Sequence, residues 1–438
     1  MSTYSRRAFL RGMGIAAAPL IVPERVFGAE APSNRITVGI IGTGRQSHNV
    51  NIPQFLNSPY AQVVAICDVD TWRLETVKAQ IEAHYAKQTG QNYAGCNVYR
   101  DFRELLARDD IDAVMISSPD HWHVPMGMAA AAAGKHFSVE KPLSTCIAHG
   151  RLLSEAVKRH GVVTRTDSEF RSLPEMWRAV ECVRNGRIGQ LKHIKVRVPG
   201  DSDPIGTPPE MPVPEELDYD LWLGPAFEKP YTEKRVHPVK DLKGRPGWLR
   251  ISDYTNGMVS NWGTHLNDIA QWANGTDRTG PVTVEGTGAF SEGLWDTIVE
   301  FQLHYTYADG VTLDYEMGKS PGVEFHGEEG WIRAIYRGEV SASNPNILRS
   351  EKEEGDIDLS GTRTDKEDFL HAIRTHSETL EPVEVGHRTV SMCQIGLIAI
   401  QVGRKLEWDP ARERFVNNDE ANARLDRPIR GSWLREYL

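Results

Sequence analysis

The chain has 438 residues, of which 40% are hydrophobic and 25% charged, an ordinary composition that suits two folded domains. Its formal net charge is −10, and about −12 without residues 1–31, which carry four basic and two acidic side chains. An acidic chain is a poor candidate for binding nucleic acids or anionic membranes through its overall charge. We therefore expect no nucleic-acid partner and no membrane anchor.

Residues 1–31 have the pattern of a twin-arginine export signal. Two adjacent arginines lie within Ser5–Arg11, the apolar stretch Met13–Val22 is too short to span a bilayer, and Ala29 and Ala31 offer cleavage sites. The alternative is a plain basic N-terminus. The twin-arginine export machinery carries folded proteins, so we expect a periplasmic protein whose cofactor is loaded beforehand. Because the periplasm has no soluble nicotinamide pool, that cofactor would be held through many turnovers.

Cysteine usage suits folding in a reducing compartment followed by export of the whole protein. The five cysteines are scattered and include no C-x-x-C pair. This spacing predicts neither a disulfide framework nor a structural zinc site.

Residues 32–165 alternate short apolar runs with helical stretches, the pattern of a parallel sheet covered on both faces. We expect strands at Ile36–Ile41, Gln62–Cys67, Ala113–Ser117, His136–Val139 and Val162–Arg165. Helices are expected near Thr71–Lys87, Phe102–Arg108, Val124–Ala133 and Ile147–Arg159. The crossover lengths suit right-handed βαβ units.

Residues 166–438 change in character after a predicted helix at Leu173–Asn185, and they predict a second domain built on a mostly antiparallel sheet. Asp309 and Gly310 are typical of a hairpin turn. Strands are expected at Lys192–Val198, Val282–Ala289, Thr297–Tyr305, Val311–Met317 and Trp331–Tyr336.

Four further segments complete the second domain. The proline-rich stretch Pro199–Pro214 predicts a long irregular loop, and the acidic run Glu351–Asp358 predicts a solvated loop. Helices at Lys366–Thr375 and Val390–Leu406 are expected to pack back on the first domain or on the sheet.

A glycine-rich loop follows the first predicted strand directly and precedes a helix. In that setting the first glycine permits a tight turn, the second lets a pyrophosphate approach the backbone, and the helix N-terminus supplies N–H donors. Ser47 stands where the usual third glycine would be. The residues expected to hold the phosphates are Gly42, Thr43, Gly44, Arg45 and Gln46.

The choice between NAD and NADP depends on two residues after the second strand. Asp68, twenty-six residues beyond Gly42, would accept hydrogen bonds from the adenosine ribose and repel a 2′-phosphate. Its alternative role is to cap the next helix. Arg73 could accommodate the phosphate of NADP, so NAD is favoured and NADP stays possible.

Four stretches, in this order and spacing, resemble the glucose-fructose oxidoreductase, inositol dehydrogenase and MocA (Gfo/Idh/MocA) family. They are Gly42–Gly44 with Asp68, Ser117–His123, Glu140–Pro142, and Asn261–His265 with Asp268 and Trp272. The resemblance covers nearly all of the chain after the leader. It implies an α/β fold with an N-terminal Rossmann domain and a C-terminal α/β domain that has a large open sheet. It also implies a carbohydrate or polyol substrate and a homo-oligomer paired through that sheet.

Lys141 directly follows the predicted strand His136–Val139, and ligands of open α/β sheets bind at the carboxyl ends of the strands. The resemblance implies that Lys141 lies between the nicotinamide ribose and the reacting hydroxyl. An ammonium there would lower the pKa of that hydroxyl and orient it. The alternative is an ordinary surface lysine.

His265 matches the catalytic histidine of the family, and its ordinary pKa suits proton transfer. The position four residues earlier, usually aspartate, holds Asn261. Residues four apart share a helix face, but an amide can neither take a proton nor balance an imidazolium by charge. Asp268, or Asp253 with Tyr254, could supply the missing acid or base; the family precedent of a tyrosine proton donor favours Tyr254.

Asp120, His121 and His123 could be drawn as a metal cluster, but they lie at a strand-to-helix transition where Asp120 is expected to serve as a cap. We expect no metal. The resemblance instead implies that this region surrounds the cofactor, and Trp262 could offer a face to a sugar ring. The further residues expected at the cofactor are Ser117, Pro119, His121, Trp122, His123, Glu140, Lys141 and Trp262.

These observations predict an NAD(P)-dependent oxidoreductase that transfers a hydride from or to a carbohydrate hydroxyl. One alternative uses the same site without net redox change, as a glycoside hydrolase that oxidises a sugar transiently, eliminates the leaving group, adds water and returns the hydride. A second alternative is a nucleotide-bound sugar-binding protein that has lost catalysis, with Asn261 as the trace of that loss.

Overall fold

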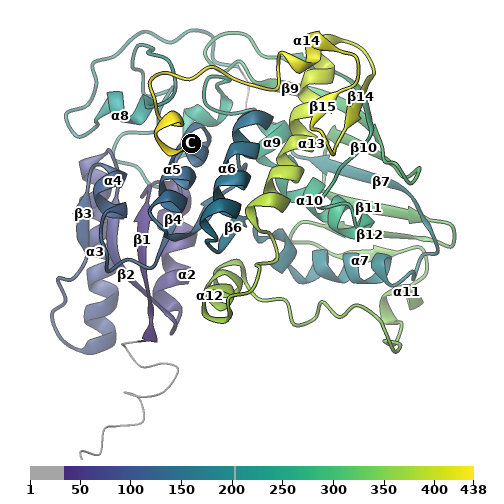
Figure 1. Ribbon diagram of the computed structural model, residues 1–438, viewed down its shortest axis with the longest axis horizontal. Coiled ribbons are helices and arrows are strands. Elements are labelled where there is room, and N and C mark those ends of the chain that lie inside the picture. Colours follow the sequence, from purple (N-terminus) through teal and green to yellow (C-terminus); the bar gives the residue numbers. More distant parts are fainter. Residues whose placement is uncertain (1–33, 202–203) are drawn as a thin grey trace, which may run out of the picture.

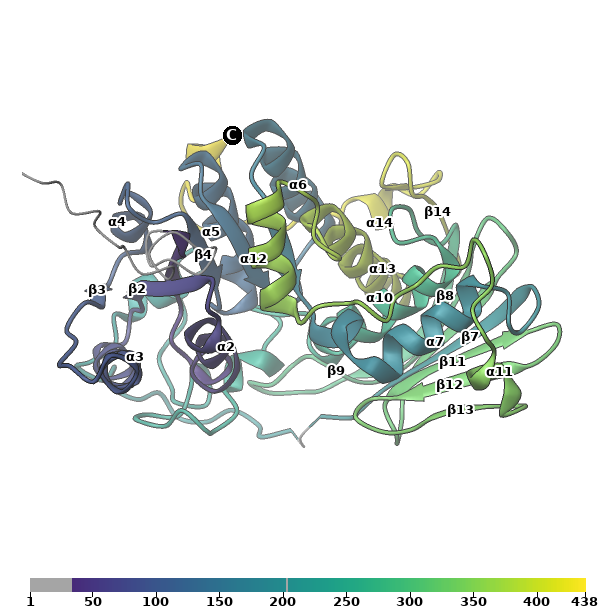
Figure 2. The same ribbon diagram turned by 90° about the horizontal axis from the view of Figure 1, so that it is seen from below.

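Two sheets organise the chain in the computed structural model, which describes residues 34–201 and 204–438 (Figure 1). The predicted export signal lies outside these residues. Figure 2 shows helices α12 (Asp365–Thr375) and α13 (Val383–Val402) running between the two sheets. No helix of the described part is both long and apolar enough to cross a membrane.

The first sheet has six parallel strands in the order β3-β2-β1-β4-β5-β6, and this confirms the predicted parallel sheet. Its central strands are buried on both faces because helices cover both sides. The strands are β1 (Ile36–Ile41), β2 (Ala61–Cys67), β3 (Asn97–Tyr99), β4 (Ala113–Ile116), β5 (His136–Glu140) and β6 (Thr164–Asp167). The sequence pattern missed β3, which is three residues long, partly exposed and lies at the sheet edge.

Helical segments join these strands. They are η3 (Ser47–Asn51), α2 (Ile52–Asn57), α3 (Thr71–Thr89), α4 (Phe102–Leu106), α5 (Asp120–Ala132) and α6 (Ile147–His160). The prediction that Asp120 caps α5 is wrong. The cap position belongs to Pro119, whose extended backbone precedes the helix, and the Asp120 side chain instead accepts a hydrogen bond from Thr255 Oγ1 at 2.7 Å.

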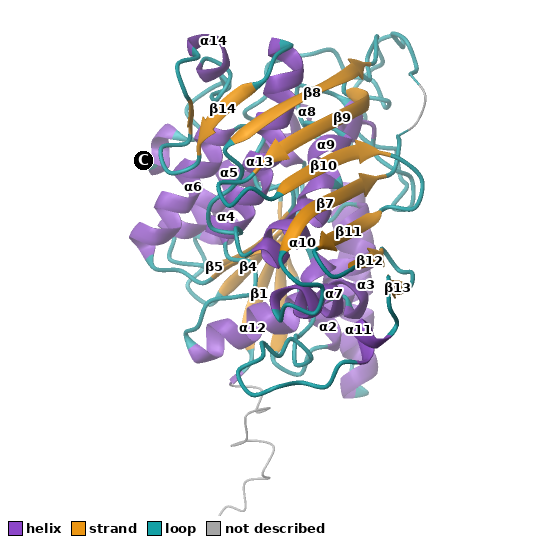
Figure 3. Ribbon diagram, turned by 90° about the vertical axis from the view of Figure 1, so that its right-hand side faces the viewer, coloured by secondary structure: helices purple, strands orange, loops and turns teal. Residues whose placement is uncertain are grey.

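The second sheet has nine strands and is antiparallel except where β10 pairs with β7. This confirms the predicted mostly antiparallel sheet. Helices lie behind it in Figure 3, and its other face is turned to the viewer. The strands are β7 (Leu191–Val198), β8 (Thr283–Phe290), β9 (Ile298–Thr306), β10 (Thr312–Met317), β11 (Gly322–Gly327), β12 (Trp331–Ile335), β13 (Val340–Ala342), β14 (Leu406–Asp409) and β15 (Arg414–Phe415).

Alternation within β7 shows why the sheet is covered on one face only. Ile194, Val196 and Val198 are fully buried against the helices, whereas Lys195 and Arg197 point to the other side. The covering helices are α7 (Pro174–Arg184), α10 (Gly263–Asn274) and α13, with the short helices α8 (Tyr219–Leu223), α9 (Met258–Asn261), α11 (Asn346–Arg349) and α14 (Asp419–Asn422) between strands.

The C-terminal helices contact both layers, as predicted. Helix α12 packs Phe369 and Leu370 into the core beneath the first sheet, and α13 contacts α6, α10 and β8. The predicted end of the last helix is wrong: α13 ends at Val402, where Gly403 adopts a left-handed conformation, and Leu406 begins β14.

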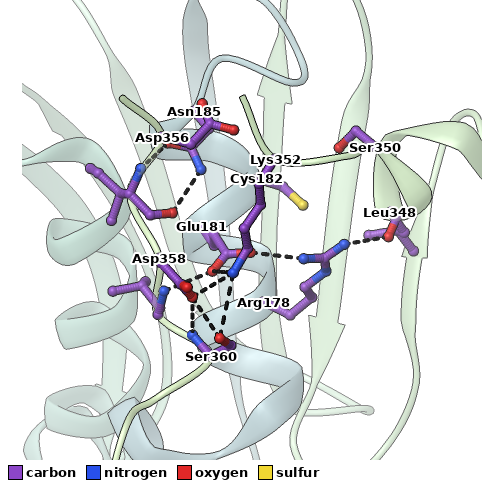
Figure 4. A network of polar contacts seen from close by, with 12 residues as sticks. Arg178, Glu181, Cys182, Asn185, Leu348, Ser350, Lys352, Asp356, Asp358 and Ser360 are labelled. Atoms are coloured by element: carbon purple, nitrogen blue, oxygen red, sulfur yellow. Dashed lines mark hydrogen bonds and ion pairs between the residues drawn. The ribbon is translucent and has the colours of Figure 1, made fainter. Parts of the chain in front are cut away.

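The acidic run 351–358 forms an irregular, largely exposed segment, in agreement with its predicted loop character. Figure 4 shows how charges hold it to α7. Lys352 lies 3.7 Å from the Glu181 carboxylate and also contacts Asp358, while Asp356 pairs with Arg187. The loop is therefore solvated but tied to the helix by its own charges.

Candidate active site

A cavity of about 1060 Å³ lies at the carboxyl ends of β1, β4, β5 and β6 and extends to α9, α10 and the end of β12. The predicted residues that line it are Gly42, Gly44, Arg45, Gln46, Asp68, Arg73, Ser117, Pro119, Trp122, His123, Glu140, Lys141, Asn261, Trp262 and His265. Thr43, His121, Tyr254 and Asp268 are not among its lining residues.

One end of the cavity has the geometry of a dinucleotide loop. Gly42 has φ +89°, and a Cβ there would lie 2.5 Å from the carbonyl oxygen of Ser117, so the turn requires glycine. A Cβ on Gly44 would meet nothing within 4 Å, which leaves its backbone open to a ligand. The buried Ser118 Oγ has no hydrogen-bond partner among the described residues. A phosphate or amide group of a dinucleotide would fit these features.

Asp68 is hydrogen-bonded to this loop. The backbone N–H and Oγ1 of Thr43 donate to its Oδ2 at 2.6 and 2.9 Å, so Thr43 orients Asp68 from outside the cavity. Arg73 forms an ion pair with Asp70 at 3.4 Å and donates to the carbonyl oxygens of Pro238 and Asp241 at 3.1 and 2.9 Å. Both residues line the cavity, but the Arg73 guanidinium is already engaged, whereas the Asp68 carboxylate, which also accepts from the Asp70 N–H at 3.0 Å, can accept further hydrogen bonds. This arrangement favours a free ribose hydroxyl over a 2′-phosphate.

The other end of the cavity brings Lys141 and His265 together. Lys141 Nζ donates to the carbonyl oxygen of Asn261 at 3.3 Å. His265 is buried, its Nδ1 lies 2.8 Å from Ser168 Oγ, and its ring stacks on Phe170 at 4.2 Å between centroids. Burial, and then the charge of Lys141, lower the pKa of His265 well below its usual value. The imidazole is therefore neutral at neutral pH, with one ring nitrogen unprotonated.

An aromatic wall stands beside these groups. The rings of Phe170 and Tyr336 stack at 4.6 Å with an interplanar angle of 7°, and Trp262 meets Tyr336 edge-on at 5.2 Å. Phe170 is fully buried by its stacking on His265 and Tyr336, so the partly exposed rings of Trp262 and Tyr336, which line the cavity, are the ones that a sugar could contact. Sequence reasoning missed Glu169, Phe170 and Tyr336. Glu169 and Phe170 come just after β6, whose carboxyl end lies at the same sheet edge as those of β1 and β5. This position could have identified them from the sequence.

Two predicted acid or base candidates lie elsewhere. Tyr254 is fully buried between His121 and Trp222, at 5.0 Å from each ring, and burial raises its pKa to about 12. Asp268 forms two hydrogen bonds of 2.7 Å with the buried guanidinium of Arg171. Tyr254, Asp268 and His121 thus have structural partners and do not line the cavity themselves; the Nε2 of His121 lies 3.2 Å from the carbonyl oxygen of Trp222, which does line it.

The histidines of the Ser117–His123 stretch are held by backbone groups. Both ring nitrogens of His123 lie within 2.9 Å of carbonyl oxygens, those of Pro142 and Ser118. Among the described residues, the grouping with metal-ligand atoms within 4.8 Å of one another is Cys146, His149 and Asp426, none of which belongs to this stretch.

Comparison with known proteins agrees with this architecture. Residues 36–168 match the model of the Gfo/Idh/MocA oxidoreductase family, NAD-binding Rossmann fold, and residues 206–435 match that of its C-terminal alpha/beta domain. A glycosyl hydrolase family 109 protein from Shewanella putrefaciens is 29% identical over 215 residues, 44% of this chain and 45% of that protein. The chain thus spans about half the length of the curated relatives that it matches.

Solved structures share the fold at low identity. The WlbA dehydrogenase from Bordetella pertussis, in complex with NADH and UDP-GlcNAcA, has a TM-score of 0.62 and 17% identity, with 86% of this chain and 99% of that chain covered. The aldose-aldose oxidoreductase from Caulobacter crescentus, complexed with glycerol, has a TM-score of 0.60 and 17% identity, with 85% and 99% covered. With its nucleotide loop, Lys141 and His265 placed as described, this chain belongs to the Gfo/Idh/MocA oxidoreductase family.

Proposed function

We propose that this protein is an NAD-dependent enzyme that hydrolyses a glycoside through transient oxidation of a sugar hydroxyl. The observation that carries the proposal is the meeting of Lys141 and a neutral His265 in one cavity with the dinucleotide loop at Gly42 and Asp68. A cation to polarise a hydroxyl and a base to take its proton are the groups that hydride transfer from a carbinol requires. The partly exposed rings of Tyr336 and Trp262, which line the cavity, support a sugar as the substrate.

In this proposal NAD would supply the group that accepts a hydride and returns it within each turnover. Lys141 binds the hydroxyl oxygen and lowers its pKa, and His265 accepts the proton. The resulting ketone acidifies the neighbouring C–H, and loss of that proton to a base forms a double bond as the glycosidic oxygen leaves with a proton. Water then adds across the double bond, and the ketone takes back the hydride and a proton to become a hydroxyl again. The net reaction is addition of water across the glycosidic bond.

Hydrolysis is preferred to net oxidation because the glycosyl hydrolase relatives reach 29–32% identity, whereas the dehydrogenases of similar fold lie at 16–20%. The curated matches also outweigh fold likeness, since one fold supports many reactions. Net oxidation of a carbohydrate or polyol hydroxyl is the second candidate, and the same Lys141 and His265 would serve it.

Incubation of the purified protein with a panel of aryl glycosides and no added nicotinamide tests the proposal. We expect catalytic release of the phenol, many equivalents per protein molecule, with no net reduction of NAD. Hydrolysis proceeds without net redox change, so added NAD should not raise the rate of a protein that already holds it. Stoichiometric reduction of added NAD by free sugars, with no glycoside cleavage, would instead establish the dehydrogenase.

The nucleotide that travels with the protein is a second test. We propose that the chain is exported by the twin-arginine route with NAD bound, and that subunits pair through the open sheet. Absorbance and mass analysis of the nucleotide released on denaturation should give NAD, because the Asp68 carboxylate can accept further hydrogen bonds and Arg73 is occupied by Asp70 and two carbonyl oxygens. Recovery of NADP would show that Arg73 leaves these partners.

A further inference from the structure

Position 261 holds an asparagine, so no carboxylate there can balance the charge of a protonated His265. When a buried imidazole takes a proton beside the ammonium of Lys141, two positive charges share a site of low polarity. A carboxylate next to the imidazolium normally relieves this and holds the ring in the correct orientation. Asn261 contributes a carbonyl oxygen to Lys141, but its amide side chain carries no charge.

Glu169 lies where such a carboxylate is needed. It begins the short helix η4 (Glu169–Ser172) directly after β6, lines the active-site cavity, and places its Oε2 3.9 Å from Nδ1 of His265. Among the described residues it is the carboxylate within ion-pair distance of that histidine. Its neighbour Ser168, fully buried, already contacts the same ring nitrogen through Oγ at 2.8 Å.

The surrounding charges favour this assignment. Glu140, which precedes Lys141 in the sequence, accepts a hydrogen bond from Asn51 Nδ2 at 2.9 Å, Asp120 accepts one from Thr255 Oγ1 at 2.7 Å, and Asp365 pairs with Lys366 at 3.0 Å. Glu169 pairs with no lysine or arginine among the described residues. Burial, with the negative charges of Glu140 and Asp365, raises the pKa of its carboxyl, and Lys141 acts in the opposite direction. Such a carboxylate gains from a cation that forms next to it.

The phenol of Tyr336 also feels the charge of Glu169, together with those of Arg337 and Glu175. Burial, and then the charge of Glu169, raise the pKa of Tyr336, so the phenol stays neutral. Tyr336 therefore supplies no competing charge at neutral pH. The guanidinium of Arg337, which also lines the cavity, lies 5.1 Å over the Tyr336 ring.

We propose that Glu169 is the positioning residue that supplies the negative charge for protonated His265, in the role that position 261 lacks, while Ser168 orients the ring. The inference rests on the proposed function for its catalytic meaning, because it names the partner of the base in that reaction. The chemical statement about the two side chains holds whether or not a glycoside is the substrate.

The pKa of His265, measured by NMR in protein labelled at histidine Cε1, tests the pairing without any activity. The signal is assigned by its loss in His265→Gln. In Glu169→Gln the imidazole should titrate about one pH unit lower than in the unchanged protein, because a negative charge that favours the imidazolium is gone. Glu169→Asp should restore most of the difference. Equal titration in the unchanged protein and in Glu169→Gln would overturn the proposal.

Kinetics add a readout that a purely structural role would not move. If the glycoside is cleaved, Glu169→Gln should lower kcat by roughly 10- to 100-fold with little change in KM, and shift the acidic limb of the pH profile to lower pH. Ser168→Ala should lower kcat without that shift, since it removes no charge. Glu378→Gln, at an exposed ion pair with Arg278, is the matched control and should change neither quantity. If the protein cleaves no glycoside, the proposed function is wrong, whereas the NMR result on the pairing of Glu169 with His265 remains valid.

Discussion

Lys141→Ala is expected to lower kcat by about 10³-fold while the protein stays folded and still releases NAD on denaturation. The ammonium lies in the cavity 3.3 Å from the carbonyl oxygen of Asn261, next to His265, and no other described lysine or arginine has that placement. Its removal leaves the hydroxyl with an ordinary high pKa, so His265 has no acidified proton to accept. Steady-state cleavage of the best aryl glycoside measures the loss.

Lys405→Ala is the control for this prediction, because Lys405 pairs with Glu285 on the surface and is half exposed. It should keep full activity. A Lys141→Ala protein as active as the unchanged one would contradict the mechanism. A chain with no activity before or after the change would favour the nucleotide-bound sugar-binding protein.

Asp268→Ala should cost about 3–5 kcal/mol of the free energy of unfolding, as measured by urea denaturation. The fully buried Asp268 carboxylate forms both of its short hydrogen bonds with Arg171, which is also buried. Without the carboxylate, the guanidinium keeps only Asp277 at 3.1 Å and the carbonyl oxygen of Leu380 at 2.8 Å. The buried guanidinium would then keep one of its two carboxylate partners, so its charge would be only partly balanced in the core.

Arg278→Ala breaks the exposed ion pair with Glu378, and it should change the free energy of unfolding by less than about 0.5 kcal/mol. Comparison of the two variants separates the stabilising effect of a buried ion pair from that of an exposed one. At temperatures where Asp268→Ala is still folded, its activity per folded molecule should be close to normal. A large loss of kcat in the fully folded variant would restore Asp268 as a participant in proton transfer.

Strand ends account for the part of the site that the sequence predicts. Gly42 follows β1, Ser117 follows β4 and Lys141 follows β5, so a parallel sheet must bring all three to one edge. The same rule applied to β6 would have found Glu169. It was missed because the stretch after β6 carries no glycine-rich or lysine-containing pattern that marks a site.

Local sequence spacing did not predict which residues the buried side chains contact. Asp268 lies one turn beyond His265 on α10, yet its carboxylate turns to Arg171, which reaches it from η4. Tyr254 is close in sequence to Asn261, yet it packs against His121 and Trp222. Periodicity fixes the face of a helix on which a residue lies, but not which buried charge or ring will meet it there.

The amino-acid sequence alone determined the parallel sheet, the mostly antiparallel character of the second sheet, the nucleotide loop, the placement of Lys141 and the family, because strand ends and helical faces follow from local pattern. It did not predict strands β3, β11, β13, β14 and β15. Only the tertiary structure decided which acid faces His265. Glu169 and His265 are 96 residues apart, and they come within 3.9 Å because β6 and α10 pack at the same cavity. Contacts between distant segments depend on how the elements pack, and no local pattern records that.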